Sequence, residues 1–359
     1  MGFEDNIRKV VPYTPGEQPQ DPGIIKLNTN ENPYPPSPAV TEVLAHFNPD
    51  SLRLYPDPAS SELISAIAEV YGVKETEVFA GVGSDDVLAM CYLTFFNSDK
   101  PVLFPDITYS FYDGGAELFR IPYRQVPLDG DFRIRPEDYE GENGGVIFPN
   151  PNAPTGILMP AETAERIIAA NPDSIVIVDE AYIDFGGESV LPLIRRYDNL
   201  VVVRTFSKSR NLAGLRIGYA FACERLISLL NDVKYSFNSY TMNRLTIAAG
   251  AACVRDTAYF ARCARRIMKT RAAVTKELTA IGFRVCDSAA NFVFVSHPDY
   301  PARELFEYLK MQHVYVRYFD RPRISEYLRI TIGTDAEMET LIRILRSYMG
   351  LPVLDLAES

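Results

Sequence analysis

Short hydrophobic runs that do not alternate between inward and outward positions recur between residues 77 and 222. They read EVFAG, PVLFP, GGVIFPN, SIVIVDEAY, NLVVVRTF and IGYAFA. Stretches with helical spacing lie between several of them, for example SDDVLAMCYLTFF (84–96) and PAETAERIIAA (160–170). Strands that are apolar on both sides are covered on both faces. The pattern therefore predicts a large α/β domain with a mostly parallel sheet flanked by helices.

The two ends of the chain follow different patterns. Residues 1–60 are rich in Pro, Asn and Tyr, which predicts an extended arm rather than helix or sheet. Residues 256–280 have the spacing of one long helix, and the last eighty residues alternate again, as a smaller α/β domain does. We expect an N-terminal arm with part of the small domain over 1–52, a large domain over 53–260 and a small C-terminal domain over 261–359.

Composition restricts the class of protein. The formal net charge of -11 argues against nucleic acid or an anionic membrane as a partner, since both require a basic face. The five cysteines are scattered without CxxC spacing, and the three histidines are isolated, so we expect a cytoplasmic protein with reduced thiols and no metal site. No apolar stretch is long enough to cross a bilayer, so we expect no membrane partner either.

Ligands of open α/β sheets bind beyond the carboxyl ends of the strands, so the polar residues at these ends are the candidates for chemistry. Lys208 follows the run VVVRTFS, and an amine placed there can form an imine with an aldehyde cofactor. The alternative is a surface lysine in a loop. Asp179 ends the run SIVIVD, where a carboxylate needs a partner. A pyridinium nitrogen or a structural arginine can fill that role.

A strand, a glycine turn and the start of a helix follow one another in VFAGVGSDDVL (78–88). The free amides at such a helix start suit a phosphate, although Ser84 can also be a simple helix cap. Ser207 and Arg216 add a hydroxyl and a guanidinium, both natural phosphate ligands. Tyr182 lies three residues after Asp179, so it can reach a phenolic oxygen on the pyridinium ring that Asp179 would bind. Tyr109 can stack on a planar ring or belong to the core.

In chain order, LNTNENP, RLYPDP, GVGSDD, PNAPTG, DEAY, FSKSRNLAGLRIGY and LRITIGT resemble the motifs of the fold-type I pyridoxal-phosphate aminotransferases. Among these, they look most similar to the histidinol-phosphate aminotransferases. The resemblance covers nearly the whole chain. It implies transfer of an amino group from L-histidinol phosphate to 2-oxoglutarate, giving imidazole acetol phosphate and L-glutamate in histidine biosynthesis.

The resemblance also implies a role for individual residues. Lys208 binds the cofactor covalently and moves the proton, Asp179 pairs with the pyridine nitrogen, and Tyr182 contacts the ring hydroxyl. Tyr109 stacks on the ring. The cofactor phosphate is held by the amides of Ser84 and Asp85, by Ser207 and Arg216, and by Tyr55 of the partner subunit in a homodimer. The substrate-binding residues are Arg329, which takes a carboxylate or a phosphate, and Arg317 and Tyr13 beside it.

One position departs from the family. The family usually has Asn directly before PTG, where it contacts the ring hydroxyl, but this chain has Ala153 there and Asn152 one place earlier. Either Asn152 turns in to bind the cofactor, as we expect, or Tyr182 contacts the hydroxyl alone.

Three other functions compete with this interpretation. Threonine-phosphate decarboxylase, a lyase, shares the fold and these motifs, and it differs in how the substrate carboxylate is set against the ring. A broad aromatic aminotransferase is a second alternative. A non-catalytic regulatory protein is disfavoured, because Lys208 is present and no DNA-binding segment is attached.

Overall fold

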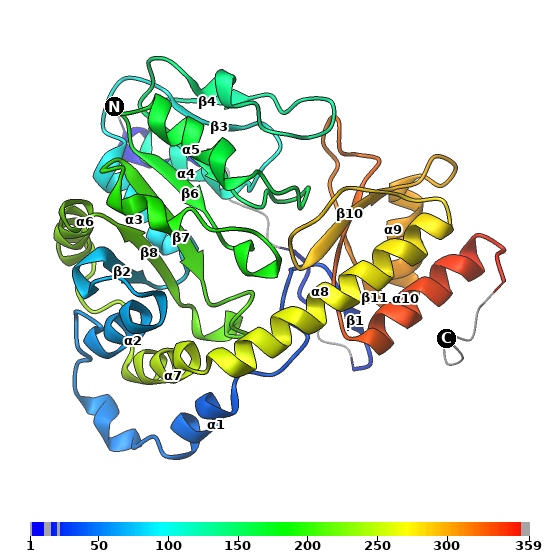
Figure 1. Ribbon diagram of the computed structural model, residues 1–359, viewed down its shortest axis with the longest axis horizontal. Helices are drawn as coiled ribbons and strands as arrows, with labels where there is room; N and C mark the ends of the chain where they lie inside the picture. Colours follow the sequence, from blue (N-terminus) through cyan, green and yellow to red (C-terminus); the bar gives the residue numbers. More distant parts are fainter. Residues whose placement is uncertain (1, 11–15, 20–21, 353–359) are drawn as a thin grey trace.

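The computed structural model describes residues 2–10, 16–19 and 22–352 of the chain. Its larger part is built on a seven-stranded sheet (Figure 1). In spatial order the strands are β2 (Val78–Gly81), β8 (Gly218–Ala222), β7 (Leu200–Thr205), β6 (Val176–Asp179), β5 (Gly145–Pro149), β3 (Val102–Pro105) and β4 (Tyr123–Val126). Strands β3 to β7 pair in parallel, whereas β8 runs antiparallel to both of its neighbours. The predicted mostly parallel sheet is confirmed.

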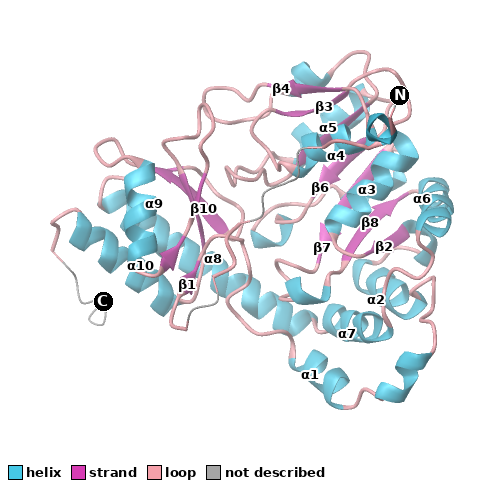
Figure 2. Ribbon diagram, turned by 180° about the vertical axis from the view of Figure 1, so that it is seen from behind, coloured by secondary structure: helices cyan, strands magenta, loops and turns pink. Residues whose placement is uncertain are grey.

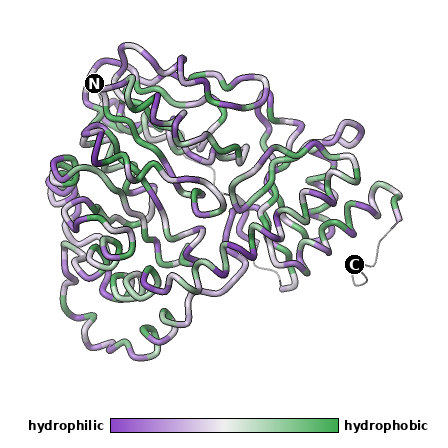
Figure 3. The backbone as a smooth tube through the Cα atoms, viewed as in Figure 1, coloured by the Kyte–Doolittle hydropathy of each residue, from purple (hydrophilic) through white to green (hydrophobic). Residues whose placement is uncertain are grey.

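Helices cover both faces of this sheet, which is why its strands are apolar throughout. Ile177 and Val201 pack under α3 (Ser84–Phe95), α4 (Phe111–Phe119) and α6 (Glu224–Phe237). The next residues along, Val178 and Val202, pack on the opposite face. That face is covered by α1 (Pro38–Ala45), α2 (Ser61–Tyr71), α5 (Ala161–Ala170) and α7 (Arg244–Arg255). Each fully buried valine contributes about 1.5–3 kcal/mol, and the hydrophobic colours in Figure 3 follow these central strands.

The smaller part has a four-stranded antiparallel sheet in the order β12 (Arg317–Tyr318), β13 (Leu328–Thr331), β10 (Phe292–Ser296) and β9 (Arg284–Val285). The helices α8 (Thr257–Ala280), α9 (Ala302–Met311) and α10 (Asp335–Tyr348) pack against it. The long helix α8 runs from the large part into the small one (Figures 1 and 2). It matches the helix predicted over 256–280, and the Asp256 carboxylate caps it by accepting from the Tyr259 N–H at 3.1 Å.

The N-terminal segment is less extended than its proline content predicts. Strand β1 (Ile25–Lys26) pairs in parallel with β11 (Val314–Tyr315) and so fastens this segment to the small domain. Beyond it, PAVTEVLA forms the helix α1, so the prediction of an arm without helix is wrong there. The reason is local: Pro38 occupies the first turn, where proline is tolerated, and the Ser37 hydroxyl caps the helix.

Strand β4 and the domain boundaries are the features of the fold that the hydrophobic pattern does not determine. The edge strand β4 (YRQV) is not predicted, because only one of its residues is buried. The division of the chain at 52 and 260 stays a prediction, and position 260 lies inside α8. Among the described residues, no helix is both long enough and apolar enough to traverse a bilayer.

Candidate active site

A cavity of about 390 Å³ lies between the two domains, at the carboxyl ends of β6 and β7. The structure brings most of the predicted site residues to this one place. From the large domain its lining includes Ser84, Asp85, Tyr109, Asp179, Tyr182, Ser207, Lys208 and Arg216, and from the small domain Arg317 and Arg329.

Lys208 is an amine held in the cavity wall without a carboxylate partner among the described residues. Its Nζ donates to the Thr29 carbonyl at 3.0 Å, and its own carbonyl accepts from Asn32 Nδ2 at 3.0 Å. Burial, followed by the positive charge of Arg329, lowers the pKa of Lys208 to about 8. An amine with this pKa is partly neutral near physiological pH, as a nucleophile or a general base must be.

Asp179 is a carboxylate buried at the end of β6. It accepts from the Tyr112 hydroxyl at 2.9 Å and from the Ala181 N–H at 3.1 Å. Burial raises the pKa of Asp179 to about 6, and no basic side chain forms an ion pair with it in the described part of the chain. The structural arginine that the sequence leaves open as a partner is therefore not present among these residues. A buried carboxylate of this kind favours a ligand that brings its own N–H cation.

The helix start after β2 forms a cradle at one end of the cavity. Gly83 has φ +90° and precedes the first turn of α3, whose leading N–H groups have no partner within the helix. A side chain at Gly218 would collide with the backbone of Gly83 and Ser84, so a glycine there lets β8 approach closely. Arg216 donates to the Ser207 hydroxyl at 3.3 Å at the same place. These donors suit a phosphate.

The small-domain wall carries two guanidinium groups. Arg317 on β12 and Arg329 on β13 are direct partners across an antiparallel pair, so their side chains leave the same face of the sheet. Arg329 donates to the Asn28 carbonyl at 3.0 Å. Both arginines line the cavity.

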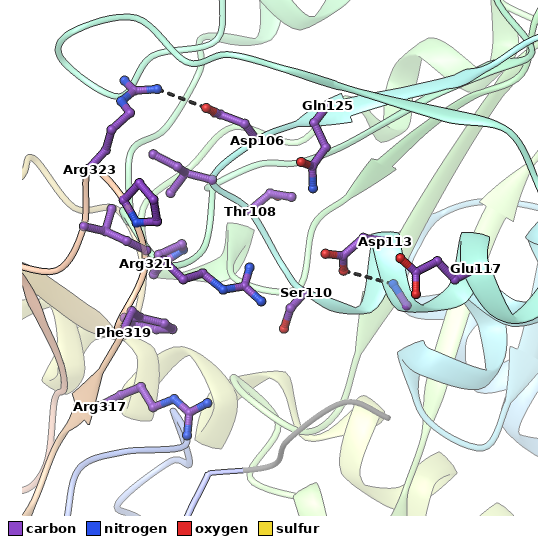
Figure 4. A pocket seen from close by; sticks show the side chains of 15 residues that line it. Asp106, Thr108, Ser110, Asp113, Glu117, Gln125, Arg317, Phe319, Arg321 and Arg323 are labelled. Atoms are coloured by element: carbon purple, nitrogen blue, oxygen red, sulfur yellow. Dashed lines mark hydrogen bonds and ion pairs between the residues drawn. The ribbon is translucent and has the colours of Figure 1, made fainter. Parts of the chain in front are cut away.

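A larger pocket of about 630 Å³ adjoins this cavity and shares Arg317 with it. Figure 4 shows Arg321 reaching across it toward Ser110 and Asp113, and Arg323 bound to Asp106 at 3.1 Å. We assign the chemistry to the smaller cavity, because Lys208 and Asp179 line it and do not line the larger pocket.

Comparisons with known proteins agree with this geometry. Residues 22–345 match the model of the family "Aminotransferase class I and II". Histidinol-phosphate aminotransferase 1 of Hydrogenovibrio crunogenus is 52% identical over 343 residues, covering 96% of either chain. The chain belongs to the class I and II aminotransferase family.

Two solved structures share the fold of this aminotransferase. The histidinol-phosphate aminotransferase of Clostridium acetobutylicum has a TM-score of 0.84 at 23% identity, covering 91% of this chain and 99% of the other. The L-threonine-O-3-phosphate decarboxylase of Porphyromonas gingivalis has a TM-score of 0.77 at 22% identity, covering 91% of this chain and all of that one (100%). At these identities the likeness concerns the fold, and it does not separate a transferase from a lyase.

Pyridoxal phosphate is the cofactor of this aminotransferase family. The residues present fit it on their own chemistry. The cavity holds a buried carboxylate that has no cationic partner among the described residues, a helix start with Arg216 and Ser207 beside it, and the amine of Lys208.

Two of the predicted site residues that the structure describes, Asn152 and Tyr55, do not line the cavity of this aminotransferase. The Asn152 amide donates to the Ile107 carbonyl at 3.0 Å and the Thr155 hydroxyl at 3.0 Å, while Ala153 faces the cavity instead. The expectation that Asn152 turns in is corrected, because its amide already serves the proline-rich turn. Tyr55 is 77% exposed at the surface of the aminotransferase, and its ring contacts that of Tyr240 at 4.6 Å between centroids. Tyr13 lies outside the described residues.

Two features of the site are not predicted from the sequence. The segment Asn28–Glu31 of the aminotransferase lines the cavity and bridges the two domains, since Lys208 donates to the Thr29 carbonyl and Arg329 to the Asn28 carbonyl. Behind the cavity wall, the Tyr112 hydroxyl on α4 donates to the Asp179 carboxylate. The segment lies in the motif LNTNENP, an Asn-rich stretch directly before prolines, and this composition is the signal that could have marked it. Nothing in the sequence around Tyr112 sets it apart from the other 20 tyrosines of the chain's 21.

Proposed function

We propose that this aminotransferase exchanges an amino group between L-histidinol phosphate and 2-oxoglutarate in the histidine pathway. The single observation that carries the choice of substrate is the arginine pair Arg317 and Arg329 beside Lys208. Two guanidinium groups on one face of a sheet match a phosphate ester, and they also match a carboxylate. The name and the 52% identity of the relative from Hydrogenovibrio crunogenus support the same choice.

Pyridoxal phosphate, when bound, takes up the amino group of the donor and passes it to the acceptor. We propose that Asp179 binds its pyridine nitrogen and that Tyr182 binds its ring hydroxyl. Tyr109, which donates to Asp85 at 2.9 Å, lies at the cavity wall where a ring can stack on it. The cradle of Ser84, Asp85, Ser207 and Arg216 holds the phosphate.

Lys208 both attaches the cofactor and moves the proton at the substrate Cα. These tasks need an amine that is neutral in part of the molecules at working pH, and the lowered pKa of Lys208, about 8, provides it. Arg329 contributes to that lowering, so the residue that binds the anionic substrate also adjusts the amine. An anion bound to Arg329 offsets its charge and raises the pKa of Lys208 again.

We propose a homodimer in which Tyr55 reaches the phosphate cradle of the partner subunit. In its own chain Tyr55 lies outside the cavity and is exposed beside Tyr240, and Leu52, Leu54 and Phe237 are exposed as well. Exposed apolar side chains that gather at a surface are typical of a protein contact. Since the five cysteines are free, the fold also suits the reducing cytoplasm, which we propose as its location.

Mixing of two variants tests the proposed dimer. Tyr55→Phe and Lys208→Ala are each expected to be impaired, while their heterodimer contains one site that carries neither lesion. We expect activity to return when the two are mixed under conditions of subunit exchange. The absence of recovery, with exchange shown by differently tagged subunits, would place Tyr55 outside the partner's site.

Half-reactions of the purified enzyme test the proposed reaction. Histidinol phosphate, phenylalanine and threonine phosphate are each added to the cofactor-loaded enzyme, and the absorbance change and the released products are followed in a single turnover. We expect the fastest amino transfer with histidinol phosphate. Faster transfer from phenylalanine identifies an aromatic aminotransferase, and carbon dioxide released from threonine phosphate identifies a lyase.

A further inference from the structure

The hydroxyl of Tyr182 has a partner from the opposite side of the cavity. Asn30 Nδ2 donates to Tyr182 Oη at 2.9 Å. Asn30 is 1% exposed and has φ 57°, a left-handed conformation that asparagine tolerates better than most residues. Where the family usually places an asparagine before PTG, this chain has the methyl group of Ala153 lining the cavity. With no asparagine at that position, the contact of Tyr182 with the ring hydroxyl gains weight, and Asn30 is the amide that contacts Tyr182.

Thr331 connects the hydrogen bonds around Asn30. The backbone N–H of Asn30 donates to Thr331 Oγ1 at 3.0 Å. The Thr331 hydroxyl in turn donates to Asn30 Oδ1 at 3.0 Å, and a hydroxyl can both accept and donate in this way. With its oxygen on Thr331, the Asn30 amide presents its NH₂ group to Tyr182. Tyr182 Oη therefore accepts, and its own proton is left to donate into the cavity.

The residues of this chain of hydrogen bonds come from both domains. Thr331 lies on β13 of the small domain, and the Asn30 carbonyl accepts from Asn291 Nδ2 of the same domain at 2.9 Å. Tyr182 follows β6 of the large domain. The orientation of the Tyr182 proton therefore depends on the small domain being in place over the cavity.

We propose that Asn30 is a positioning residue that directs the phenolic proton of Tyr182 toward the ring hydroxyl of the cofactor. The proposal rests on the proposed function in taking that ring oxygen as the acceptor. It adds a residue of the N-terminal segment, anchored to the small domain through Thr331 and Asn291, to the residues that hold the cofactor ring, and it makes this hold depend on domain closure.

Asn30→Asp is the sharpest test, because it changes one atom and keeps the shape. The new carboxylate still accepts from Thr331 but cannot donate, so the Tyr182 proton turns toward it and away from the cofactor. We expect the apoenzyme to bind pyridoxal phosphate at least about tenfold more weakly. We also expect the spectral pKa of the Lys208-bound cofactor to rise by about one unit, since a proton donor to the ring oxygen is lost.

A double-mutant cycle separates positioning from a direct effect of the new charge. If Asn30 acts through Tyr182, the spectral shift caused by Asn30→Asp shrinks to a small fraction in a Tyr182→Phe background. An undiminished shift in that background, or no shift in the single variant, overturns the proposal. Failure of the proposed function looks different: the wild-type enzyme itself then transfers no amino group from histidinol phosphate.

Two further variants protect the test against a folding defect. Thr331→Val leaves Asn30 without the donor that fixes its amide, and the same spectral shift is expected at smaller size, while Thr331→Ser restores the wild-type value. The matched control is Asn171→Asp, at another buried asparagine whose amide donates to the Tyr139 and Ile167 carbonyls outside the cavity. It is expected to lower stability without moving the spectral pKa, and an equal shift there overturns the proposal as well.

Discussion

The two walls of the cavity differ in the kind of charged group that they carry. The large-domain wall holds Asp179 and Lys208 in conditions that disfavour their charged forms, with pKa values moved to about 6 and about 8. The small-domain wall carries two guanidinium groups, because Arg317 and Arg329 lie side by side on one face of the sheet. The first wall is adjusted for proton transfer, and the second is adjusted for gripping an anion.

This difference shows how the fold separates chemistry from recognition. The large-domain groups follow strands that are buried under helices on both faces, and burial is the main cause of the pKa shifts of Asp179 and Lys208. The small-domain arginines sit on a short antiparallel sheet that reaches the large domain through α8 and the bridge Asn28–Glu31. Changes in the first wall should therefore affect the rate of the chemical step, and changes in the second should affect substrate binding.

The largest expected effect follows from removing Lys208. Lys208→Ala deletes both the attachment of the cofactor and the proton carrier, so kcat should fall by at least about 10⁴-fold. The phosphate cradle remains, so the variant should still bind the cofactor, which equilibrium dialysis measures. Borohydride reduction of the wild-type enzyme followed by peptide mapping should place the cofactor on Lys208.

Lys234→Ala is the matched control, since Lys234 is also a buried lysine of the large domain and donates to the Pro58 carbonyl at 3.1 Å, away from the cavity. It should lose stability and keep the borohydride label. A label on any lysine other than Lys208 would contradict the assignment of the large-domain wall.

Asp179→Asn should come next, with a loss of about 10³-fold in the proton-transfer step, the scale of a major electrostatic contribution. The same change should stabilise the apoenzyme. Because burial raises the pKa of Asp179 from 3.8 to about 6, the wild-type apoenzyme loses stability as the pH rises through 6, whereas the variant has no carboxylate to ionise. The difference in unfolding free energy should grow from near zero at pH 4 to on the order of 2–3 kcal/mol above pH 7.

Urea unfolding of both apoenzymes between pH 4 and 8 measures this difference. Asp57→Asn provides a control of opposite sign, because hydrogen bonds from Ser61 lower the pKa of Asp57. That variant should be less stable than the wild type, and its deficit should shrink on acidification. A pH-independent difference for Asp179→Asn would show that the buried carboxylate carries no ionisation cost.

The sequence predicts the large-domain wall better than the small-domain wall, and the reason is local. Asp179, Ser207 and Lys208 end or follow apolar strands, so the topology rule for α/β sheets alone places them together. Asn30 contacts Tyr182 because the fold brings it against Thr331, which is 301 positions away in the chain, and no local sequence pattern predicts such a contact. The prediction that Asn152 turns into the cavity fails because the spacing of residues in the sequence does not reveal the hydrogen bonds of its amide to the Ile107 carbonyl and the Thr155 hydroxyl.

The small-domain wall is tested by Arg329→Lys, which keeps the charge but loses the planar fork. Both histidinol phosphate and glutamate should bind more weakly, each by about 1.5–3 kcal/mol, the scale of a charged hydrogen bond. Phenylalanine should be affected only through its carboxylate. The KM and kcat of each substrate check this, and kcat should change little if recognition is separate from chemistry.

Arg271→Lys is a suitable control, since Arg271 is another arginine of the small domain and donates to the Phe185 carbonyl at 3.0 Å outside the cavity. If Arg329→Lys weakens glutamate and leaves histidinol phosphate unchanged, one arginine does not serve both anions. Arg317 then becomes the candidate for the phosphate.

The smallest expected effect concerns a contact that joins the same two walls outside the cavity. Arg323 of the small domain reaches Asp106 at 3.1 Å and the Leu128 carbonyl at 2.9 Å across the larger pocket (Figure 4). The Asp106 and Arg323 side chains are 26% and 37% exposed, so water screens their attraction.

The variant Asp106→Asn tests this contact. In the wild type the Leu128 N–H donates to Asp106 Oδ1 at 2.9 Å, and the asparagine of the variant keeps an oxygen for this bond. Arg323 keeps the Leu128 carbonyl as its acceptor. The unfolding free energy should therefore fall by about 0.2–1 kcal/mol, with kcat/KM within about threefold of the wild type. A tenfold loss in kcat/KM would mean that closure of the two walls is controlled at this outer contact, and recognition and chemistry would then not be separable by wall.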